Sequence, residues 1–506
     1  MSMNIFFQYA MAGMVYLSAF FIFLLGLIAI YGILLFFIDK TQTRDSIRYN
    51  YPVIGRFRYI FSELGEFFRQ YFFAMDREEM PFNRAERDWV YKSSRGVDNT
   101  VAFGSTKNLN VAGTVIFNNS AFPLLDSEAQ EPAYITFGEG CETPYVTNSV
   151  INISGMSFGA LSGPAVKALS KGAELAGCWM NTGEGGLSPY HMHGNADIVF
   201  QIGTAKYGVR NAEGHLDQDK LRELGTFPFV KMFEIKLSQG AKPGKGGILP
   251  GAKVTAEIAR IRGISEGEPS ISFNRHPEID NVQSLLDFID LVRGLVKKPV
   301  GIKMVIGGTD WFDDFAKEIH KRGIASAPDF ITVDSGDGGT GAAPMPLIDN
   351  VGLPIRQALP LLVDKLNEFG LRERIKVNAS GKLITPAEVA WAYCAGADTV
   401  STARGFMFAL GCIQALKCNK NTCPTGITTH NRRLQRGLDP SDKAVRVANF
   451  ANKIQYGSGL IAHSCGVTQV RDLRRNHCRV VQDTGVAVCF NELYPDAEMT
   501  YKLAAL

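Results

Sequence analysis

The stretch FITVDSGDGGTGAAP, residues 330–344, joins a short apolar run to a loop that contains four glycines. The run has the β-branched and aromatic content of a buried strand, and the glycines after it predict a tight, conformationally permissive loop. Seven further runs of this kind alternate with longer segments of helical pattern, which predicts repeated βα units. The eight predicted strands are Val150–Ile153, Cys178–Asn181, Met232–Ile235, Ser270–Phe273, Val300–Met304, Phe330–Val333, Ile375–Asn378 and Thr399–Thr402.

The residues that follow the predicted strands share one character. Nearly every strand is followed by polar or glycine-rich sequence, such as SGMSFGALSG after the first, NTGEGG after the second and ASGK after the seventh. Eight parallel strands whose carboxyl ends hold the unusual residues predict an α/β fold, a (β/α)8 TIM barrel with its site on one face. A doubly wound open sheet is the alternative, but it would gather its glycines at one switch point.

The composition limits the classes of function. The chain has 506 residues, of which 46% are apolar and 20% charged, as is typical of globular proteins. A net charge of +3 is small for this length and gives no indication of nucleic acid as a partner. Nine cysteines in such a chain do not make a disulfide scaffold.

The first 38 residues contain no Lys, Arg, Asp or Glu, and most of them are apolar. This run exceeds the ~20 residues that cross a bilayer, and no positive segment precedes it as in a signal peptide. We therefore expect a transmembrane helix, with a buried hairpin of a soluble fold as the alternative. The excess of cations directly after the run predicts a single-pass protein of the inner (cytoplasmic) membrane, with everything after Asp39 in the cytoplasm. These cations are Lys40, Arg44, Arg48, Arg56 and Arg58.

The chain is expected to divide into five parts. They are a transmembrane anchor (1–40), a juxtamembrane helical linker (41–100), a cap or lead-in segment (101–146), the barrel (147–436) and a mostly helical C-terminal extension (437–506). Residues 55–73, GRFRYIFSELGEFFRQYFF, carry aromatic residues on one side. They predict either a helix that lies in the lipid headgroup layer or an amphipathic helix packed on the main domain. In the extension, RDLRRNHCRV (residues 471–480) is expected to be a solvated basic face.

Three cysteines lie close together in GCIQALKCNKNTCPTG, residues 411–426. Cys412, Cys418 and Cys423 have a looser spacing than the paired cysteines of zinc sites, and a proline follows the last of them. Thiolates suit iron–sulfur clusters, and three without a nearby fourth favour the 3Fe-4S form over buried structural thiols.

Two other groups of residues predict ligand binding. The loops ASGK (379–382) and STARG (401–405) follow the last two predicted strands, where TIM barrels often hold a phosphate group. Together with the glycines of 336–341 they indicate a phosphorylated cofactor, and flavin mononucleotide (FMN) is the usual one in such a barrel. The segment KLSQGAKPGKGG (236–247) supplies Lys236, Gln239 and Lys242, and Arg262 follows. Such crowded cations can hold carboxylates or phosphates, with Glu184 nearby as a candidate proton donor or orienting group.

The chain resembles the synthase domain of glutamate synthase over roughly residues 147–435. The resemblance is carried by ISGMSFGALS, NTGEGG, IKLSQGAKPGKGG with LPGAKV, DSGDGGTGAAP, and GCIQALKCNKNTCPTG. It implies an FMN-dependent oxidoreductase, and it implies that Cys412, Cys418 and Cys423 ligate a 3Fe-4S cluster. It also implies that 2-oxoglutarate is held by Glu184, Lys236, Gln239, Lys242 and Arg262. We expect the FMN site to comprise Ser157, Asn181, Lys303, Gly338, Gly339, Ser380, Gly381, Lys382, Ala403 and Arg404.

Two departures from the glutamate synthase pattern shape the expected reaction. The chain begins MSMN and has no room for a glutaminase domain before the apolar run, and no G-x-G-x-x-G follows a strand. We therefore expect reductive amination of 2-oxoglutarate with ammonia or another amine donor, electrons from a separate ferredoxin-like or other carrier, and possible use of a separate glutaminase subunit. The alternatives are an FMN and iron–sulfur oxidoreductase that acts on another 2-oxo acid or imine, and a membrane-anchored electron relay without amination activity.

Overall fold

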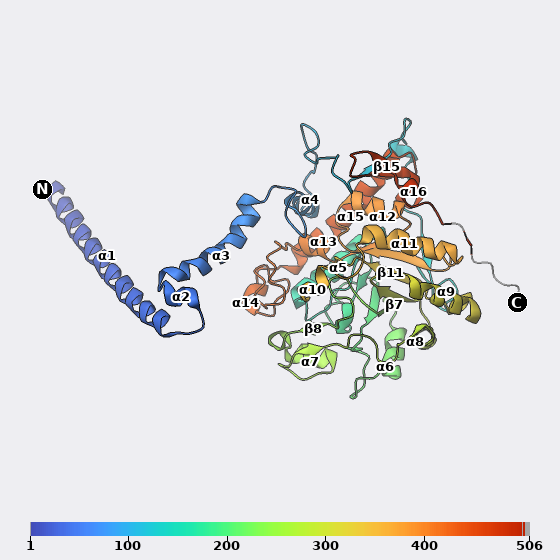
Figure 1. Cartoon of the computed structure of the whole chain (residues 1–506), viewed down its shortest axis with the longest axis horizontal. Helices are drawn as coiled ribbons and strands as arrows, with labels where there is room; N and C mark the ends of the chain where they lie inside the picture. The colour runs from blue at the N-terminus through green and yellow to red at the C-terminus, as the bar shows by residue number, and fades with distance from the viewer. Residues whose placement is uncertain (1, 498, 501–506) are drawn as a thin grey trace. The chain divides into compact units, whose positions relative to one another are not determined.

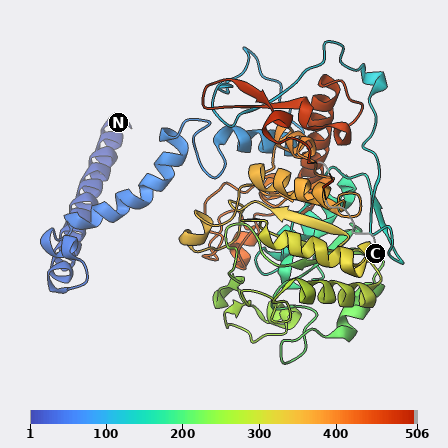
Figure 2. The ribbon, with the colours of Figure 1, turned by 45° about the vertical axis from the view of Figure 1, so that its right-hand side comes forward.

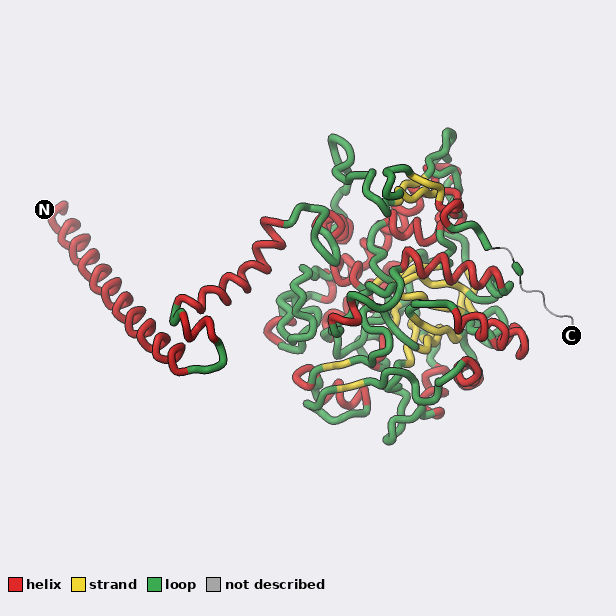
Figure 3. Tube along the Cα trace, in the orientation of Figure 1, coloured by secondary structure: helices red, strands yellow, loops and turns green. Residues whose placement is uncertain are grey.

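Eight parallel strands close into a barrel in the computed structural model, which describes residues 2–497 and 499–500. The strands follow one another around the barrel in chain order, and Figure 3 shows them at the centre of the domain with helices outside. They are β4 (Ile151–Ile153), β5 (Met180–Asn181), β6 (Ile198–Ile202), β7 (Val230–Lys236), β10 (Val300–Met304), β11 (Phe330–Asp334), β12 (Lys376–Ser380) and β13 (Thr399–Thr402). The predicted TIM barrel is confirmed.

The helices between the strands begin and end at residues with clear local causes. At α5 the Ser162 side chain accepts a hydrogen bond from the Ala165 amide, and Gly177 ends the helix with φ of 65°. At α12 a capping box between Thr385 and Glu388 starts the helix directly before Pro386. The barrel helices are α5 (Gly163–Ala176), α6 (Gln218–Thr226), α7 (Ala256–Arg262), α8 (Val282–Val296), α9 (Asp310–Arg322), α10 (Met345–Ile348), α11 (Ile355–Glu368), α12 (Pro386–Cys394), α13 (Arg404–Ala409) and α14 (Arg432–Gln435).

One of the predicted barrel strands is wrong. Ser270–Phe273 lies outside the barrel, where β9 (Ser270–Ile271) pairs antiparallel with β8 (Ile248–Leu249). The fourth predicted strand is replaced by β6 (Ile198–Ile202), which the sequence analysis did not identify and which is buried along its whole length. The physical reason is burial on both faces: a barrel strand has no solvent side, whereas Ile271 is 68% exposed.

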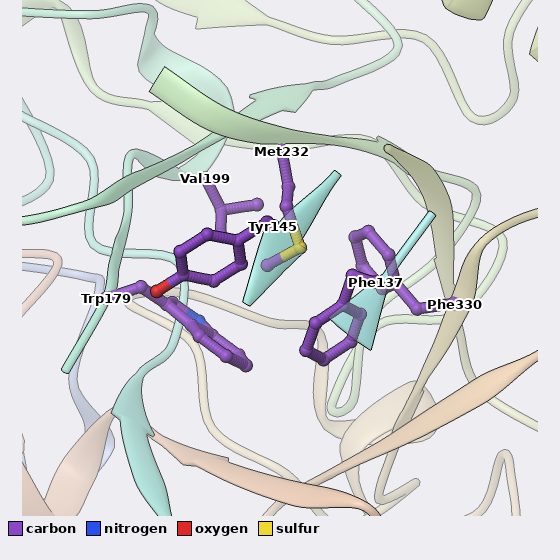
Figure 4. Packing of buried hydrophobic residues seen from close by; sticks show 6 residues of the cluster. All are labelled: Phe137, Tyr145, Trp179, Val199, Met232 and Phe330. Carbon is purple, nitrogen blue, oxygen red and sulfur yellow. The ribbon is translucent and has the colours of Figure 1, made fainter. Parts of the chain in front are cut away.

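A hairpin closes the end of the barrel at which the strands begin. It consists of β2 (Ile135–Phe137) and β3 (Tyr145–Thr147), which pair antiparallel. The Phe137 ring makes edge-to-face contacts with Trp179 and Phe330, with ring centroids 5.6 Å apart in both pairs. The buried cluster comprises Phe137, Tyr145, Trp179, Val199, Met232 and Phe330 (Figure 4). Because this end is filled with side chains, a ligand site can form only at the opposite end.

The C-terminal extension packs on the side of the barrel. Its long helix α15 (Pro440–Ser464) lies against α5 and α12. Beyond it, β14 (Cys478–Val481) pairs with β15 (Ala487–Cys489) and with β1 (Val115–Phe117), and α16 (Phe490–Leu493) follows. Figure 2 shows these C-terminal segments in red. The helix α4 (Arg84–Ser94) contributes Trp89, whose ring centroid is 6.3 Å from that of Phe450 on α15.

The interpretation of residues 471–480 as a solvated basic face holds only in part: Arg474 and Arg479 are exposed, but Arg471 and Arg475 are not. Arg475 is only 3% exposed and donates hydrogen bonds to Asp364 and to the backbone carbonyls of Tyr494 and Pro495. Arg471 donates to the Ser149 carbonyl at 2.7 Å. A guanidinium has five donors in a planar fork, so these arginines satisfy loop carbonyls instead of facing water.

The residues up to Ala85 form a separate compact unit. It contains α1 (Ser2–Thr41), α2 (Ser46–Asn50), the short 3-10 helix η1 (Ile54–Arg56), α3 (Phe57–Phe68) and the helical turn η2 (Arg69–Phe73), of which Figure 1 labels the three α-helices. Residues 5–41 form a helix that is long and apolar enough to cross a membrane and is not buried within the described part of the chain. Length and composition alone do not separate such a span from a signal sequence.

Candidate active site

A polar cavity opens at the end of the barrel where the strands finish. Its empty volume, open solvent included, is about 510 Å³. Seven of the eight strands contribute residues at their carboxyl ends or in the loops that follow, as expected for a barrel enzyme. The lining residues are Ser154, Gly155, Gln201, Lys236, Gln239, Lys303, Asp334, Gly339, Ser380, Gly381, Lys382, Thr402, Ala403 and Arg404.

Cations and glycines from the loops after β11, β12 and β13 meet on one side of this cavity. The Lys382 ammonium lies 2.7 Å from the Asp337 carboxylate. Burial acts to raise the pKa of Asp337, but hydrogen bonds from Lys382 and Ser335 and the charge of Arg404 outweigh it and lower that pKa. A Cβ atom at Gly339 would lie 2.7 Å from Nε of Arg404, so only glycine lets the loop pass this close to the guanidinium. Two cations, Lys382 and Arg404, therefore lie beside a glycine-rich loop and the Asp337 carboxylate on this side of the cavity.

The Gly381 position also requires glycine. Its φ is 118°, and a Cβ atom there would lie 2.3 Å from that of Ser335. Nearby, Lys303 lies 3.5 Å from the Asp334 carboxylate, which also accepts the amide of Gly240 at 2.9 Å. The loops after β7, β11 and β12 are thus fixed against one another at the cavity wall.

A carboxylate and two further polar side chains occupy the neighbouring side of the cavity mouth. Glu184, in the loop after β5, lies 2.7 Å from the ammonium of Lys236 at the end of β7. The same ammonium donates to the side-chain oxygen of Gln239. A Cβ atom at Gly247 would overlap the Glu184 carboxylate, since it would lie 2.2 Å from Oε1. The glycine therefore makes the room in which this carboxylate sits.

Lys242 and Arg262 add two more cations around Glu184. Burial acts to raise the pKa of Glu184, but the charges of Lys236, Lys242 and Arg262 outweigh it and lower that pKa to about 2. Burial lowers the pKa of Lys242 to about 8, against the opposing effect of Glu184. Burial also lowers the pKa of Arg262. The group, which we call the cationic clamp (Glu184, Lys236, Lys242 and Arg262), has three cations and one carboxylate.

The Arg262 guanidinium is held by residues that the sequence analysis did not identify. It donates to Ser270 Oγ at 3.1 Å and to the Phe158 carbonyl at 3.3 Å, and it lies over the Tyr207 ring with 5.0 Å to the centroid. Ser270 Oγ in turn donates to the Tyr207 hydroxyl at 2.7 Å. The Nε atom of Arg262 is buried and has no hydrogen-bond partner within the described residues. This donor can be satisfied by a ligand or by a buried water.

Asn181 is placed inside the barrel and does not line the cavity. Its amide donates to Glu234 at 2.8 Å, and the same carboxylate accepts from Gln201 at 2.7 Å and from Thr332 at 2.6 Å. The Asn181 oxygen accepts the Gly183 amide at 2.9 Å. This buried network positions Gln201, which does line the cavity, and it fixes the start of the loop that carries Glu184.

The three clustered cysteines share one loop after α13. The thiols interact, since burial and the nearby Cys418 and Cys423 together raise the pKa of Cys412 to about 12. At Cys423, hydrogen bonds from Thr425 and Thr428 outweigh burial and lower the pKa. Among the described residues, no set of three or more His, Cys, Asp or Glu is placed to hold a single metal ion. The donor set of three neighbouring thiols nevertheless suits an iron–sulfur cluster, whose ligands bind different iron atoms.

Lys253 and His430 link the cysteine loop to the loop after β4. Lys253 is 3% exposed and donates to the carbonyls of Cys418 at 3.3 Å and Ala160 at 2.9 Å. Nε2 of His430 lies 2.8 Å from the Gly159 carbonyl. Because Phe158 in this loop accepts from Arg262, the cysteine loop and the cationic clamp are held by the same short segment.

Comparison with known proteins agrees with this arrangement. Residues 106–468 match the family described as a conserved region in glutamate synthase. The chain belongs to the glutamate synthase family. The predicted resemblance is confirmed, and with it the class of oxidoreductases.

The relatives differ in how much of their own length matches this chain. A glutamate synthase large subunit-like protein YerD of Bacillus subtilis is 38% identical over 93% of this chain and 97% of its own. An archaeal glutamate synthase [NADPH] of Methanocaldococcus jannaschii is 36% identical over 65% of this chain, but the match spans 61% of that protein. Among solved structures, flavocytochrome b2 with pyruvate bound has a TM-score of 0.45 at 15% identity, covering 83% of this chain and 90% of its own. That likeness is too weak to carry an argument.

The structure brings together most of the residues predicted for a glutamate synthase site. Lys236, Gln239 and seven residues of the predicted FMN site line the cavity, namely Lys303, Gly339, Ser380, Gly381, Lys382, Ala403 and Arg404. Ser157 and Gly338 belong to loops beside it and are not among the lining residues. The sequence analysis missed Ser154, Gly155, Gln201, Asp334 and Thr402. Their position in the sequence could have identified them, because each is at the end of a barrel strand or follows one. Gln201 was missed because β6 was not predicted.

Proposed function

We propose that this member of the glutamate synthase family forms glutamate by reductive amination of 2-oxoglutarate. The observation that carries the proposal is the charge of the cationic clamp, in which three cations surround one carboxylate. The surplus of two positive charges matches the two carboxylates of 2-oxoglutarate, and the clamp adjoins the cavity through Lys236. A monocarboxylate would leave one of these charges unpaired in a largely buried site.

FMN fits the cavity beside the clamp. The partly buried cations and the glycines of the loops after β11, β12 and β13 provide donors for a phosphate, with Lys382 and Arg404 as its partners. When bound, FMN would supply the hydride chemistry that side chains lack. Lys303, Gln201 and Ser380 then lie along the cavity wall, where they can donate hydrogen bonds to a planar ring system.

The side chains of the clamp have separate tasks in the proposed reaction. Lys236, Lys242 and Arg262 bind and orient the substrate carboxylates, which fixes the position of the keto carbon. Glu184 remains ionised at neutral pH because its pKa is about 2. It can therefore accept a hydrogen bond from an N–H of the incoming amine, or accept a proton from it.

We further propose that Cys412, Cys418 and Cys423 hold a 3Fe-4S cluster and that α1 anchors the chain in the cytoplasmic membrane, with the barrel in the cytoplasm. Support comes from three interacting thiols on one loop and from an apolar helix that is followed by cations. Such a cluster would supply one-electron transfer from a separate carrier. Ammonia, free or from a separate glutaminase subunit, or another amine donor is the proposed nitrogen source.

Ligand-induced stabilisation of the full chain with FMN bound tests the substrate. We expect 2-oxoglutarate to raise the thermal unfolding midpoint clearly more than pyruvate at equal concentration, because only the dicarboxylate pairs with both surplus charges. A lost hydrogen bond to a charged group costs about 1.5–3 kcal/mol, or roughly 10- to 150-fold in affinity. Equal shifts with the two acids would contradict the assignment of 2-oxoglutarate and favour another 2-oxo acid.

The binding of 2-oxoglutarate should weaken as the pH rises through about 8. Lys242, whose pKa burial lowers to about 8, is charged below that pH and neutral above it. Above pH 8 the clamp therefore loses one of its three cations, and affinity measured by calorimetry should fall up to ~10-fold by pH 9. In the Lys242→Arg variant the cation persists, so its affinity should stay constant over this range. A matching decline in that variant would contradict the role of Lys242.

A further inference from the structure

An apolar helical face in the N-terminal unit has no part in the proposed reaction. We call it the α3 face. At ~100° per residue its side chains occupy an arc of about 140°, which is the pattern of an amphipathic helix. The α3 face comprises Phe57, Ile60, Phe61, Leu64, Phe67, Phe68, Tyr71 and Phe72.

The α3 face is not covered by other parts of the N-terminal unit. None of the residues of α3 or η2 is buried, and Phe61 and Phe72 are 66% and 68% exposed. Its aromatic rings contact mainly one another, since the ring centroids of Phe67 and Tyr71 are 4.8 Å apart and those of Phe68 and Phe72 are 5.6 Å apart. A contiguous exposed apolar surface of this kind marks an interaction with another protein or with a membrane.

A network of ion pairs fixes the start of α3 to the end of α1. The Asp39 carboxylate is fully buried and accepts hydrogen bonds from Arg48 at 2.7 Å, from Arg56 at 2.6 Å and from the Val53 amide at 3.0 Å. Because Arg56 directly precedes Phe57, the first residue of α3 is held next to the last turn of α1. We call this network the Asp39 corner.

A second contact fixes the direction in which α3 leaves the corner. The Tyr59 hydroxyl donates to Asp45 at 2.6 Å, and Asp45 is the N-cap residue of α2. The start of α3 is therefore held at Arg56, its N-cap residue, by Asp39 and at Tyr59, in its first turn, by Asp45. Its apolar residues follow with no intervening linker.

We propose that α3 lies in the headgroup layer of the membrane that α1 spans, with the α3 face against the acyl chains. The inference rests on the proposed membrane anchoring by α1. The Asp39 corner consists of charged groups, so it lies at the boundary where α1 leaves the hydrocarbon layer, and α3 starts at the same depth. The polar side of the helix carries Arg58 and Arg69 together with Glu63 and Glu66, so it is charged without a net charge and suits the polar headgroup layer.

Continuity with α1 favours lipid over a protein as the occupant. α3 begins at the membrane boundary. Its exposed apolar arc is therefore next to the acyl chains, and no soluble partner is needed to cover it. Interfacial helices of this composition bury their apolar side by about 5–10 Å below the headgroups. Of the two interpretations that the sequence left open, we infer the headgroup layer from this continuity with α1.

Depth-dependent fluorescence quenching of the full chain tests the proposal. The protein is reconstituted in vesicles of phosphatidylcholine and phosphatidylglycerol that carry bromine either near the headgroups or near the chain ends. Phe68→Trp places the probe on the α3 face, and Ser62→Trp places it on the polar side of the same helix. The unsubstituted protein gives the background of its four tryptophans. We expect blue-shifted emission from Phe68→Trp and quenching by shallow bromines that exceeds quenching by deep bromines about twofold or more.

A third variant separates this proposal from the anchoring on which it rests. Ile28→Trp lies eleven residues before Asp39 in α1, about 16 Å deeper at 1.5 Å per residue, near the centre of a bilayer. Shallow quenching at position 68, none at 62 and deep quenching at 28 support the proposal. Deep quenching at 28 with none at 68 overturns it and indicates that a protein surface covers the α3 face. Equal quenching at 62 and 68 also overturns it. The absence of quenching at all three positions overturns the anchoring as well.

Discussion

Lys242→Ala is expected to reduce glutamate formation about 30-fold or more while the protein keeps its bound flavin. Lys242 is a buried cation that acts on Glu184 and lies in the cationic clamp. Removal of one partner from a buried group of charges costs about 2–5 kcal/mol, and ~1.4 kcal/mol corresponds to tenfold. The measurement is the rate of glutamate formation from 2-oxoglutarate and ammonia with chemically reduced protein, together with the flavin absorbance.

The chain provides a matched control three residues away. Lys245 belongs to the same loop but is exposed, so Lys245→Ala changes the net charge equally without altering the clamp. We expect its rate to remain within about twofold of the unsubstituted protein, since exposed charges contribute little. Equal losses in both variants would indicate a general charge effect. Full activity of Lys242→Ala would remove Lys242 from the substrate site.

The Lys242→Ala variant also distinguishes the proposed enzyme from an electron relay. A relay needs no clamp for a dicarboxylate, so Lys242→Ala should leave electron transfer through the protein unchanged. In the proposed enzyme, Lys242→Ala should also lose the rise in unfolding midpoint that 2-oxoglutarate causes. The proposed flavin site is on the other side of the cavity, around Lys382 and Arg404, and is expected to be unaffected.

The barrel could be predicted from the sequence because its strands are short apolar runs with glycine-rich ends. The identity of every strand could not. Ser270–Phe273 and Ile198–Ile202 are both short runs that can form a strand, and they pair in different sheets. One local signal was available: five consecutive residues of β6 are buried, whereas Ile271 and Phe273 are exposed and alternate with buried Ser270 and Ser272. Strand pairing over long sequence separations is not encoded in either run alone.

The residues of the cationic clamp could be predicted from the sequence better than the side chains that hold them in place. Lys236, Gln239 and Lys242 belong to one glycine-rich loop, so their proximity follows from the sequence alone. The Tyr207 and Ser270 side chains that hold Arg262 could not be predicted, because they come from separate loops that only the folded barrel brings together. The position of a residue at the end of a strand predicts that it reaches the cavity. It does not predict which other side chains hold that residue in place.

Cys418→Ala is expected to remove iron and acid-labile sulfide from the protein while the barrel and its flavin remain. The thiol is the only group that the substitution removes, and a cluster with three cysteine ligands has none to spare. The backbone carbonyl of Cys418, which accepts from Lys253, is retained in alanine. The measurements are iron and sulfide content of anaerobically purified protein and its electron paramagnetic resonance spectrum.

The loop around Cys418 should keep its fold in this variant because other contacts hold it. The Tyr91 hydroxyl donates to the Cys412 carbonyl at 2.6 Å, and Thr429 donates to the Asn421 carbonyl at 2.6 Å. The lost cluster would still lower the stability of the loop, because binding of a metal centre contributes to folding free energy. We therefore expect faster hydrogen exchange in residues 411–430 and little change in the barrel strands.

Cys489→Ala is the matched control for the loss of iron. Cys489 is a partly exposed cysteine at the end of β15, outside the cysteine loop, and its removal should leave iron content unchanged. Loss of iron in Cys418→Ala alone would support the cluster at Cys412, Cys418 and Cys423. Zinc in place of iron in the unsubstituted protein, or iron retained in Cys418→Ala, would contradict it. In either case the cationic clamp could still bind 2-oxoglutarate, because none of its four side chains belongs to the cysteine loop.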